Sequence, residues 1–293
     1  MVHHDSVSRK IFNVFNILFF LVIITLCLYP LWYIFVQSLS SGPLAVNAVA
    51  WPINFTLKNY ADVFKSGDVP HAFLISVLRT SIGTACTLLA CMLLGYLFSK
   101  EDMPLRKVMY RILIITMYVS GGLIPTYLVY KAYRLTNSFL VYILPAVVDA
   151  YYVILIKTYV EQLPISVEES AMIDGAGTMC IFLKIILPMS LPIVATIAIY
   201  ASVGQWNSWF DNHIYAISNK KILTLQYMLY RYLQEAESIV RELKERDPGA
   251  AVPITPRGVR MTVTMITVVP VLCIYPFFQK FFKDGVYLGA VKG

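Results

Sequence analysis

Charged residues are scarce in this chain of 293 residues, where Asp, Glu, Lys and Arg make up only 14% of the sequence. Soluble domains carry about 25% of such residues. Hydrophobic residues make up 58%, and the mean hydropathy is +0.67. This composition excludes an ordinary water-soluble domain and indicates an integral membrane protein.

Cysteine and histidine are also few and scattered. Five cysteines and four histidines occur, and only His3 and His4 are adjacent. The spacing matches neither a disulfide framework nor a metal site, so we expect no metal on this chain. The net charge of +7 lies largely beside apolar segments. That placement favours membrane topology over nucleic-acid binding as its explanation.

A nucleotide-binding loop is missing. The string G-x-x-x-x-G-K-[ST] occurs nowhere, and Gly175-Ala176-Gly177 is not followed by lysine. We therefore expect no catalysis and no cofactor on this chain. If it works in an ATP-driven machine, ATP and Mg²⁺ must be bound by another chain.

Long apolar segments dominate what is present. A membrane-spanning helix needs about 20 apolar residues, and backbone groups in lipid are satisfied only within helices or closed barrels. The sequence predicts an all-α integral membrane protein with six transmembrane helices, at residues 11–36, 72–98, 108–130, 139–159, 185–205 and 261–282. The first segment exceeds the roughly 7–15 residues of a cleavable signal core, so we expect it to be retained.

Basic residues orient these spans. With both termini inside, ten Lys or Arg flank the inner side and four lie in the short outer loops. The predicted cytoplasmic segments are 1–10, 160–184 and 283–293, and the predicted extracytoplasmic segments are 37–71 and 206–260. Residues 222–245 of the second outer segment have the pattern of an amphipathic helix. This helix either lies on the outer face of the bundle or contacts an external binding protein.

The stretch Pro164–Pro192 is the most structured polar part of the sequence. Ser166 and Glu169 have capping-box spacing, which predicts a helix starting at Val167. Asp174-Gly175 predicts its end, since glycine readily takes the left-handed conformation. Thr178 is expected to cap a second helix, which Pro188 and Pro192 then perturb.

This stretch resembles the EAA loop of ABC-importer membrane subunits. Glu169, Ser170 and Ala171 match its first motif with Ser in place of Ala, and Gly175, Ile185, Leu187 and Pro188 follow in register. The resemblance implies a coupling helix gripped by an ATPase subunit, with contacts from Glu168, Glu169, Ser170, Ala171, Asp174, Gly175, Ala176, Leu187 and Pro188. The alternative is that Glu169 merely closes the capping box with Ser166.

Several polar and aromatic residues are candidates for a solute path. Gln205, Trp206, Asn207 and Trp209 combine aromatic faces, which stack on sugar rings, with amides, which bridge hydroxyls. The alternative is an interfacial aromatic belt. The Trp-Asn pair resembles carbohydrate-importer subunits.

Asp149 is expected in mid-membrane, beside Tyr152. It either lines a pore or forms a buried polar pair, and the family more often has Asn at this place. Gly121-Gly122 interrupts the third span, and the neighbouring Tyr118 could face the route. The alternative there is helix packing through small residues.

The resemblance extends over most of the chain, including a tail with Gly289 and Lys292 that is similar to the end of maltose-type sugar permeases. It implies a type I ABC importer subunit for sugars, in the branch that imports complex or uronic-acid oligosaccharides such as alginate. The implied partners are a second permease, two ATP-binding subunits, an extracytoplasmic solute-binding protein and the lipid of a bacterial inner membrane. In that family the tail reaches the ATPase pair.

Two other functions remain to be distinguished. A secondary carrier or channel would need no ATPase and would favour inverted repeats or paired intramembrane charges. An intramembrane enzyme would need clustered acids or histidines near one face, whereas the sequence analysis finds Asp149 alone.

Overall fold

The computed structural model describes residues 7–41, 45, 47–65, 68–234 and 258–273. Within these residues every regular element is a helix. The chain divides into two compact units, Met1–Gly67 with Arg231–Val268 and Asp68–Tyr230 with Val269–Gly293. The predicted all-α fold class is therefore confirmed for the part that is described.

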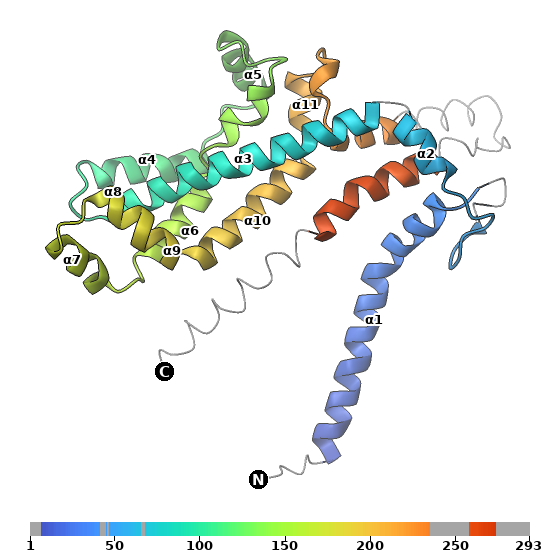
Figure 1. Ribbon diagram of the computed structural model, residues 1–293, viewed down its shortest axis with the longest axis horizontal. Helices are drawn as coiled ribbons and strands as arrows, with labels where there is room; N and C mark the ends of the chain where they lie inside the picture. The colour runs from blue at the N-terminus through green and yellow to red at the C-terminus, as the bar shows by residue number, and fades with distance from the viewer. Residues whose placement is uncertain (1–6, 42–44, 46, 66–67, 235–257, 274–293) are drawn as a thin grey trace. The chain divides into compact units, whose positions relative to one another are not determined.

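The first unit contains a long apolar helix, α1 (Val7–Ser38), coloured blue in Figure 1. In the most apolar 18 residues of α1, no residue is buried by the rest of this chain. Its end is fixed by polar contacts, in which Ser38 Oγ lies 2.8 Å from Tyr60 Oη and Asn59 donates to the Ser38 carbonyl at 2.9 Å. Asn59 and Tyr60 belong to α2 (Lys58–Lys65). Because so much apolar surface is costly in water, lipid or another subunit must cover α1.

The second unit is built on α3 (Asp68–Ser99), which packs against α6 (Ala150–Val160) and α10 (Leu191–Asn207) (Figure 1). Fully buried side chains at this contact include Tyr96, Ile156 and Ile197. Gly95 permits the close approach, because a Cβ there would lie 2.5 Å from the Ile156 side chain. The packing of α3, α6 and α10 holds in place the loops that connect to their ends.

The third and fourth predicted spans are not single helices. Residues 108–130 contain α4 (Arg106–Tyr118), a break ending at Gly122 with φ of 79°, and α5 (Leu123–Ala132). Residues 139–159 contain two short 3₁₀ turns, η2 (Phe139–Tyr142) and η3 (Leu144–Ala146), followed by α6 at a bend of 43°. The sequence anticipated the first break from its glycines, but not the second.

The fifth predicted span is also divided. The helical stretch Thr178–Met189 consists of α8 (Thr178–Ile181), a π-helical turn η4 (Phe182–Ile186) and α9 (Leu187–Met189). It meets α10 at an angle of 79°. Pro192 lies in the first turn of α10, where a missing N–H costs little, so the proline sets the position of the bend.

Two described helices, Ile11–Ser38 and Asp68–Ser99, are long and apolar enough to cross a membrane, and up to four spans result if each bent pair counts as one. The sixth predicted span is described only over the helix Gly258–Cys273. The count of six therefore stays a prediction.

The described part of the outer segment holds α11 (Phe210–Tyr215), the 3₁₀ turn η5 (Lys220–Ile222) and a helix at residues 225–234. Leu225, Met228 and Leu229 are buried as the amphipathic pattern predicts, whereas Leu233 keeps 40% of its surface exposed.

Candidate functional site

The EAA-like loop begins with α7 (Ile165–Ile173). Its start differs from the prediction, since Pro164 takes the N-cap position and the Val167 N–H already bonds to the Pro164 carbonyl at 3.2 Å. Ser166 is thus inside the first turn, and its carbonyl accepts from Ser170 Oγ at 2.8 Å. The predicted Ser166–Glu169 capping box is wrong, because the helix closes its first turn two residues earlier.

The end of α7 follows the sequence prediction. Gly175 has φ of 80°, the left-handed conformation that favours glycine. The Gly175 N–H bonds to the Met172 carbonyl at 3.0 Å, and the Ala176 N–H bonds to the Ala171 carbonyl at 2.9 Å. These two bonds form a Schellman motif, which satisfies the last carbonyls and turns the chain sharply. α8 then begins at Thr178, with Gly177 rather than Thr178 as its N-cap.

An ion pair ties α7 to the rest of the second unit. Glu168 is buried, and its Oε2 pairs with Lys100 Nζ just past the end of α3. Lys100 Nζ also lies 4.6 Å from the centre of the Tyr96 ring, within the range of a cation–π contact. Glu168 is therefore committed to this chain, whereas its neighbour Glu169 is exposed.

The other side of the loop is uncovered. Ile165, Met172 and Ile173 are exposed by 71%, 54% and 85%, and Ser170 and Asp174 are exposed as well. Ala171 and Ala176, in contrast, pack against the core of this chain. Exposed apolar side chains beside carboxylates make a surface suited to a protein partner.

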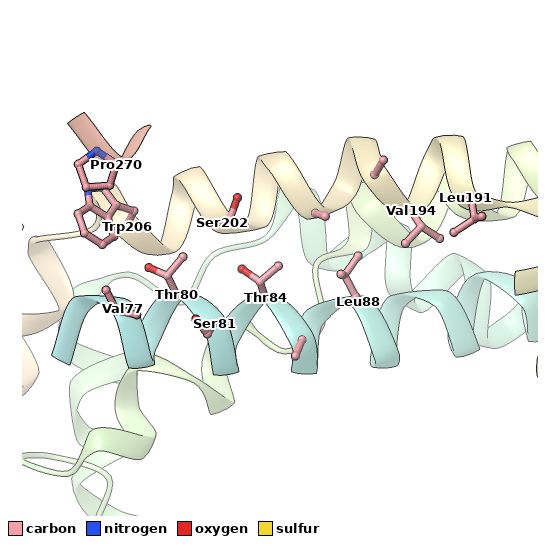
Figure 2. A pocket seen from close by; sticks show the side chains of 13 residues that line it. Val77, Thr80, Ser81, Thr84, Leu88, Leu191, Val194, Ser202, Trp206 and Pro270 are labelled. Atoms are coloured by element: carbon pink, nitrogen blue, oxygen red, sulfur yellow. The ribbon is translucent and has the colours of Figure 1, made fainter. Parts of the chain in front are cut away.

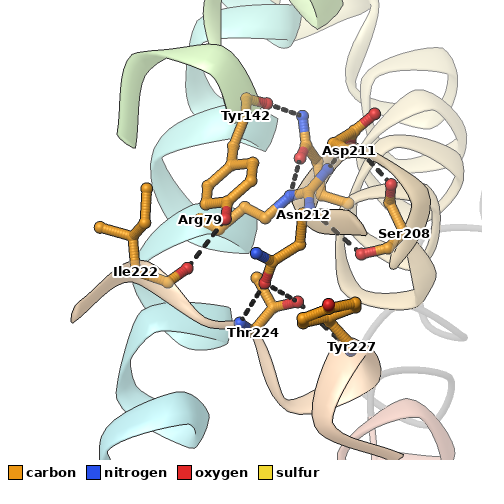
Figure 3. Close-up of polar contacts among 9 residues, drawn as sticks. Arg79, Tyr142, Ser208, Asp211, Asn212, Ile222, Thr224 and Tyr227 are labelled. Carbon is orange, nitrogen blue, oxygen red and sulfur yellow. Dashed lines mark hydrogen bonds and ion pairs between the residues drawn. The ribbon is translucent and has the colours of Figure 1, made fainter. Parts of the chain in front are cut away.

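A buried arginine is the centre of a second polar cluster (Figure 3). Arg79, on α3, keeps 2% of its surface exposed. Its Nε donates to Gln205 Oε1 at 2.9 Å, its Nη1 donates to the Ser208 carbonyl at 3.1 Å, and its Nη2 pairs with Asp211 Oδ2. The guanidinium lies 4.5 Å from the centre of the Tyr142 ring. A buried charge needs such partners, because its desolvation is otherwise prohibitive.

Neighbouring hydrogen bonds hold the loops around Arg79. Tyr142 Oη donates to the Ile222 carbonyl at 2.8 Å, and Gln205 Nε2 donates to the Tyr142 carbonyl at 3.3 Å. Asn212 Oδ1 accepts from the Thr224 N–H at 2.8 Å, as Figure 3 shows. The cluster thus joins α3, η2, the end of α10, α11 and the segment after η5.

A polar cavity of about 240 Å³ adjoins the cluster. Asp149 lies in its wall, and its Oδ1 accepts from the N–H groups of Tyr151 and Tyr152 at 2.9 and 3.2 Å. Asp149 is thus the N-cap of α6. The polar residues of its lining include Arg79, Asp149, Tyr152, Gln205, Ser208 and Asp211.

A separate apolar groove of about 560 Å³ lies between α3 and α10 (Figure 2). The hydroxyls of Thr80 and Thr84 are buried there without a hydrogen-bond partner among the described residues. Trp206 stands at one end and packs edge-on against Phe73, with 5.8 Å between the ring centres. The lining is mostly aliphatic, with four hydroxyl-bearing side chains and Trp206 among it.

Comparisons with known proteins agree on one family. No protein-family model matches the chain. The polygalacturonan/rhamnogalacturonan transport system permease of Bacillus subtilis is 32% identical over 288 residues, covering 98% of this chain and 100% of that protein. The chain belongs to the permease subunits of carbohydrate ABC importers.

Similarity to two further proteins supports this family assignment. The arabinooligosaccharide transport system permease of Bacillus subtilis is 25% identical over 304 residues and covers all of both chains. The crystal structure of a bacterial ABC transporter involved in the import of alginate, an acidic polysaccharide, contains a chain with 25% identity and a TM-score of 0.81 over 95% of the permease and 99% of that chain. Such permeases are non-catalytic membrane subunits that work with a partner permease, ATPases and a binding protein.

The structure brings together only some of the predicted path residues. Asp149, Tyr152 and Gln205 line one cavity. Trp206 faces the apolar groove, and Trp209 stacks on Tyr230 with 4.1 Å between ring centres. Asn207 and Tyr118 do not line this cavity. Asn207 is exposed, and Tyr118 keeps 83% of its surface exposed. Gly289 and Lys292 lie outside the described residues.

The sequence patterns do not single out Arg79 or Asp211, and the structure shows that Asp149 is not the lone charge of this region. Arg79 lies inside the predicted span 72–98, where a charge is costly and by default functional. That signal was available. Asp211 carried none, because nothing in its sequence neighbourhood shows that the outer segment folds back to α3.

Proposed function

We propose that the permease carries oligosaccharides containing uronic acids across the bacterial inner membrane, as half of an ATP-driven pathway. The similarity to the polygalacturonan/rhamnogalacturonan permease carries this substrate class, since it extends over nearly the whole of both chains. The likeness to a chain of the alginate importer supports it, because alginate is also acidic. The remaining wall of the pathway belongs to a second, related permease.

Coupling to ATP uses the exposed side of α7. Ile165, Met172 and Ile173 insert into a groove of a cytoplasmic ATPase, and Glu169 pairs with a basic residue at its rim. Two ATPase subunits bind ATP with Mg²⁺, and both termini of the permease lie in the cytoplasm. ATP binding moves α7, opens the cavity outward to a solute-binding protein, and hydrolysis resets it.

Uptake by the reconstituted importer tests this function. The permease, its partner permease and its ATPases are placed in vesicles with the binding protein outside, and uptake of labelled oligogalacturonate is followed. We expect uptake that requires ATP and that exceeds uptake of neutral arabinooligosaccharides. Uptake that continues without ATP would instead indicate a secondary carrier or channel, and preference for the neutral sugar would refute the substrate class.

The docking surface is tested by its own pair of variants. Ile173→Asp places a charge at the most exposed apolar position of α7 and should weaken ATPase binding about tenfold or more. Leu183→Asp is the control, because Leu183 is 52% exposed but lies beyond α7. Equal ATPase binding by both variants would argue against docking through α7.

A further inference from the structure

We infer that Arg79 is the carboxylate-recognising residue of the permease, and that Asp211 occupies the place of the substrate carboxylate while the cavity is empty. This inference rests on the proposed uronic-acid substrate and names the residue that selects it. A buried guanidinium cannot be left without an anion at acceptable cost. An exchange of one carboxylate for another keeps Arg79 neutralised throughout transport.

Arg79 is held rigidly on every side but one. The Gln205 amide fixes Nε, the Ser208 carbonyl fixes Nη1, and the Tyr142 ring covers one face of the guanidinium. Gly83 allows Gln205 to take this position, since a Cβ at residue 83 would lie 2.7 Å from Gln205 Nε2. A guanidinium held in this way is preorganised for a carboxylate at Nη2.

Asp211 is the displaceable partner. Its side chain keeps 32% of its surface exposed, against 3% for that of Arg79, so Asp211 can regain water when it leaves. It retains a local bond as well, because Ser208 Oγ donates to Asp211 Oδ2 at 2.8 Å. The other two partners of Arg79, the Ser208 carbonyl and the buried Gln205 amide, have no such access to water when they leave the guanidinium.

The cavity suits the rest of a uronic-acid residue. Tyr152, Gln205 and Ser208 line its wall, and their side chains are of the polar types that bind sugar hydroxyls. Asp149 is the other carboxylate in the lining, and it is turned to the N–H groups at the start of α6. The helix dipole there offsets its charge, so Asp149 repels the substrate less than a free carboxylate would.

The test compares two substrates in the reconstituted importer, oligogalacturonate and its methyl ester, which has the same sugar ring but no charge. For the unaltered protein we expect the KM for the ester to be about tenfold higher. Arg79→Gln should raise the KM for oligogalacturonate about tenfold relative to that for the ester. Arg79→Lys keeps the charge and should restore part of the preference.

Asp211→Asn gives the decisive result. It removes the internal competitor and leaves Arg79 without an anion in the empty cavity, so the KM for oligogalacturonate should fall severalfold relative to that for the ester. A purely structural ion pair would make this variant worse for both substrates, which would overturn the inference. Equal KM values for acid and ester in the unaltered protein would overturn it too. If the unaltered importer took up neither oligogalacturonate nor its ester, the proposed function itself would be refuted.

Discussion

Lys100, at the end of α3, forms an ion pair with the buried Glu168 of α7. The adjacent Glu169 faces outward. Glu168 is therefore used inside the chain, whereas Glu169 is accessible to the ATPase that we propose as its partner. The ion pair also links α7 directly to the end of α3, so a displacement of α7 would pull on α3.

We predict that Glu168→Ala and Glu169→Ala separate these two roles. Glu168→Ala should lower the stability of the permease by roughly 1–2 kcal/mol, because Lys100 loses its anion but can reach water. Glu169→Ala should leave stability unchanged and weaken ATPase binding. Thermal unfolding in detergent and ATPase co-purification measure the two effects. The exchanged pair Lys100→Glu with Glu168→Lys should recover stability, and equal unfolding temperatures for the two alanine variants would contradict the assignment.

Two glycines of the same loop offer a matched comparison. Gly175→Ala should destabilise the loop by about 1–2 kcal/mol, because a Cβ is strained at a φ of 80°. Gly177→Ala should be close to neutral, since Gly177 has an ordinary φ of −72°. A Cβ at either position meets no atom within 4 Å. The difference in stability between the two variants therefore measures the cost of placing a side chain at a positive φ. Unfolding temperatures measure it, and an equal cost at both sites would disprove the explanation.

Asp149 caps α6 with its Oδ1, which accepts from the N–H groups of Tyr151 and Tyr152. Asp149→Ala should cost about 1 kcal/mol of stability, whereas Asp149→Asn should cost little, because an amide oxygen caps a helix equally well. The unfolding temperature in detergent distinguishes the variants. If Asp149→Asn were as unstable as Asp149→Ala, the negative charge itself would be required.

Gly83 is expected to be intolerant of any side chain. Gly83→Ala pushes against Gln205, whose amide holds Arg79. We predict that this variant lowers the rate of oligogalacturonate uptake several-fold. Gly121→Ala is the control, because a Cβ at Gly121 meets only the Pro125 Cβ, at 3.9 Å, and Gly121 does not line the cavity. Normal uptake by Gly83→Ala would show that Gln205 can shift without consequence.

The membrane class, the helical fold and the family can all be predicted from the amino-acid sequence. Apolar segments of spanning length must be helical in lipid, and the motif from Glu169 to Pro188 is specific enough to indicate a coupling loop. It also placed the end of α7, because Gly175 is the residue that adopts the required backbone conformation without strain.

Three features became visible only in the folded chain: which of the two adjacent glutamates is buried, the start of α7 at Ile165, and the contact of Arg79 with Asp211. The reason is physical. Periodicity and capping preferences act over a few residues, whereas Arg79 and Asp211 are 132 positions apart and are joined by the packing of α3, α10 and α11. Local patterns carry no information about such a meeting, so Asp149 stood out in the sequence and the more deeply buried charge did not.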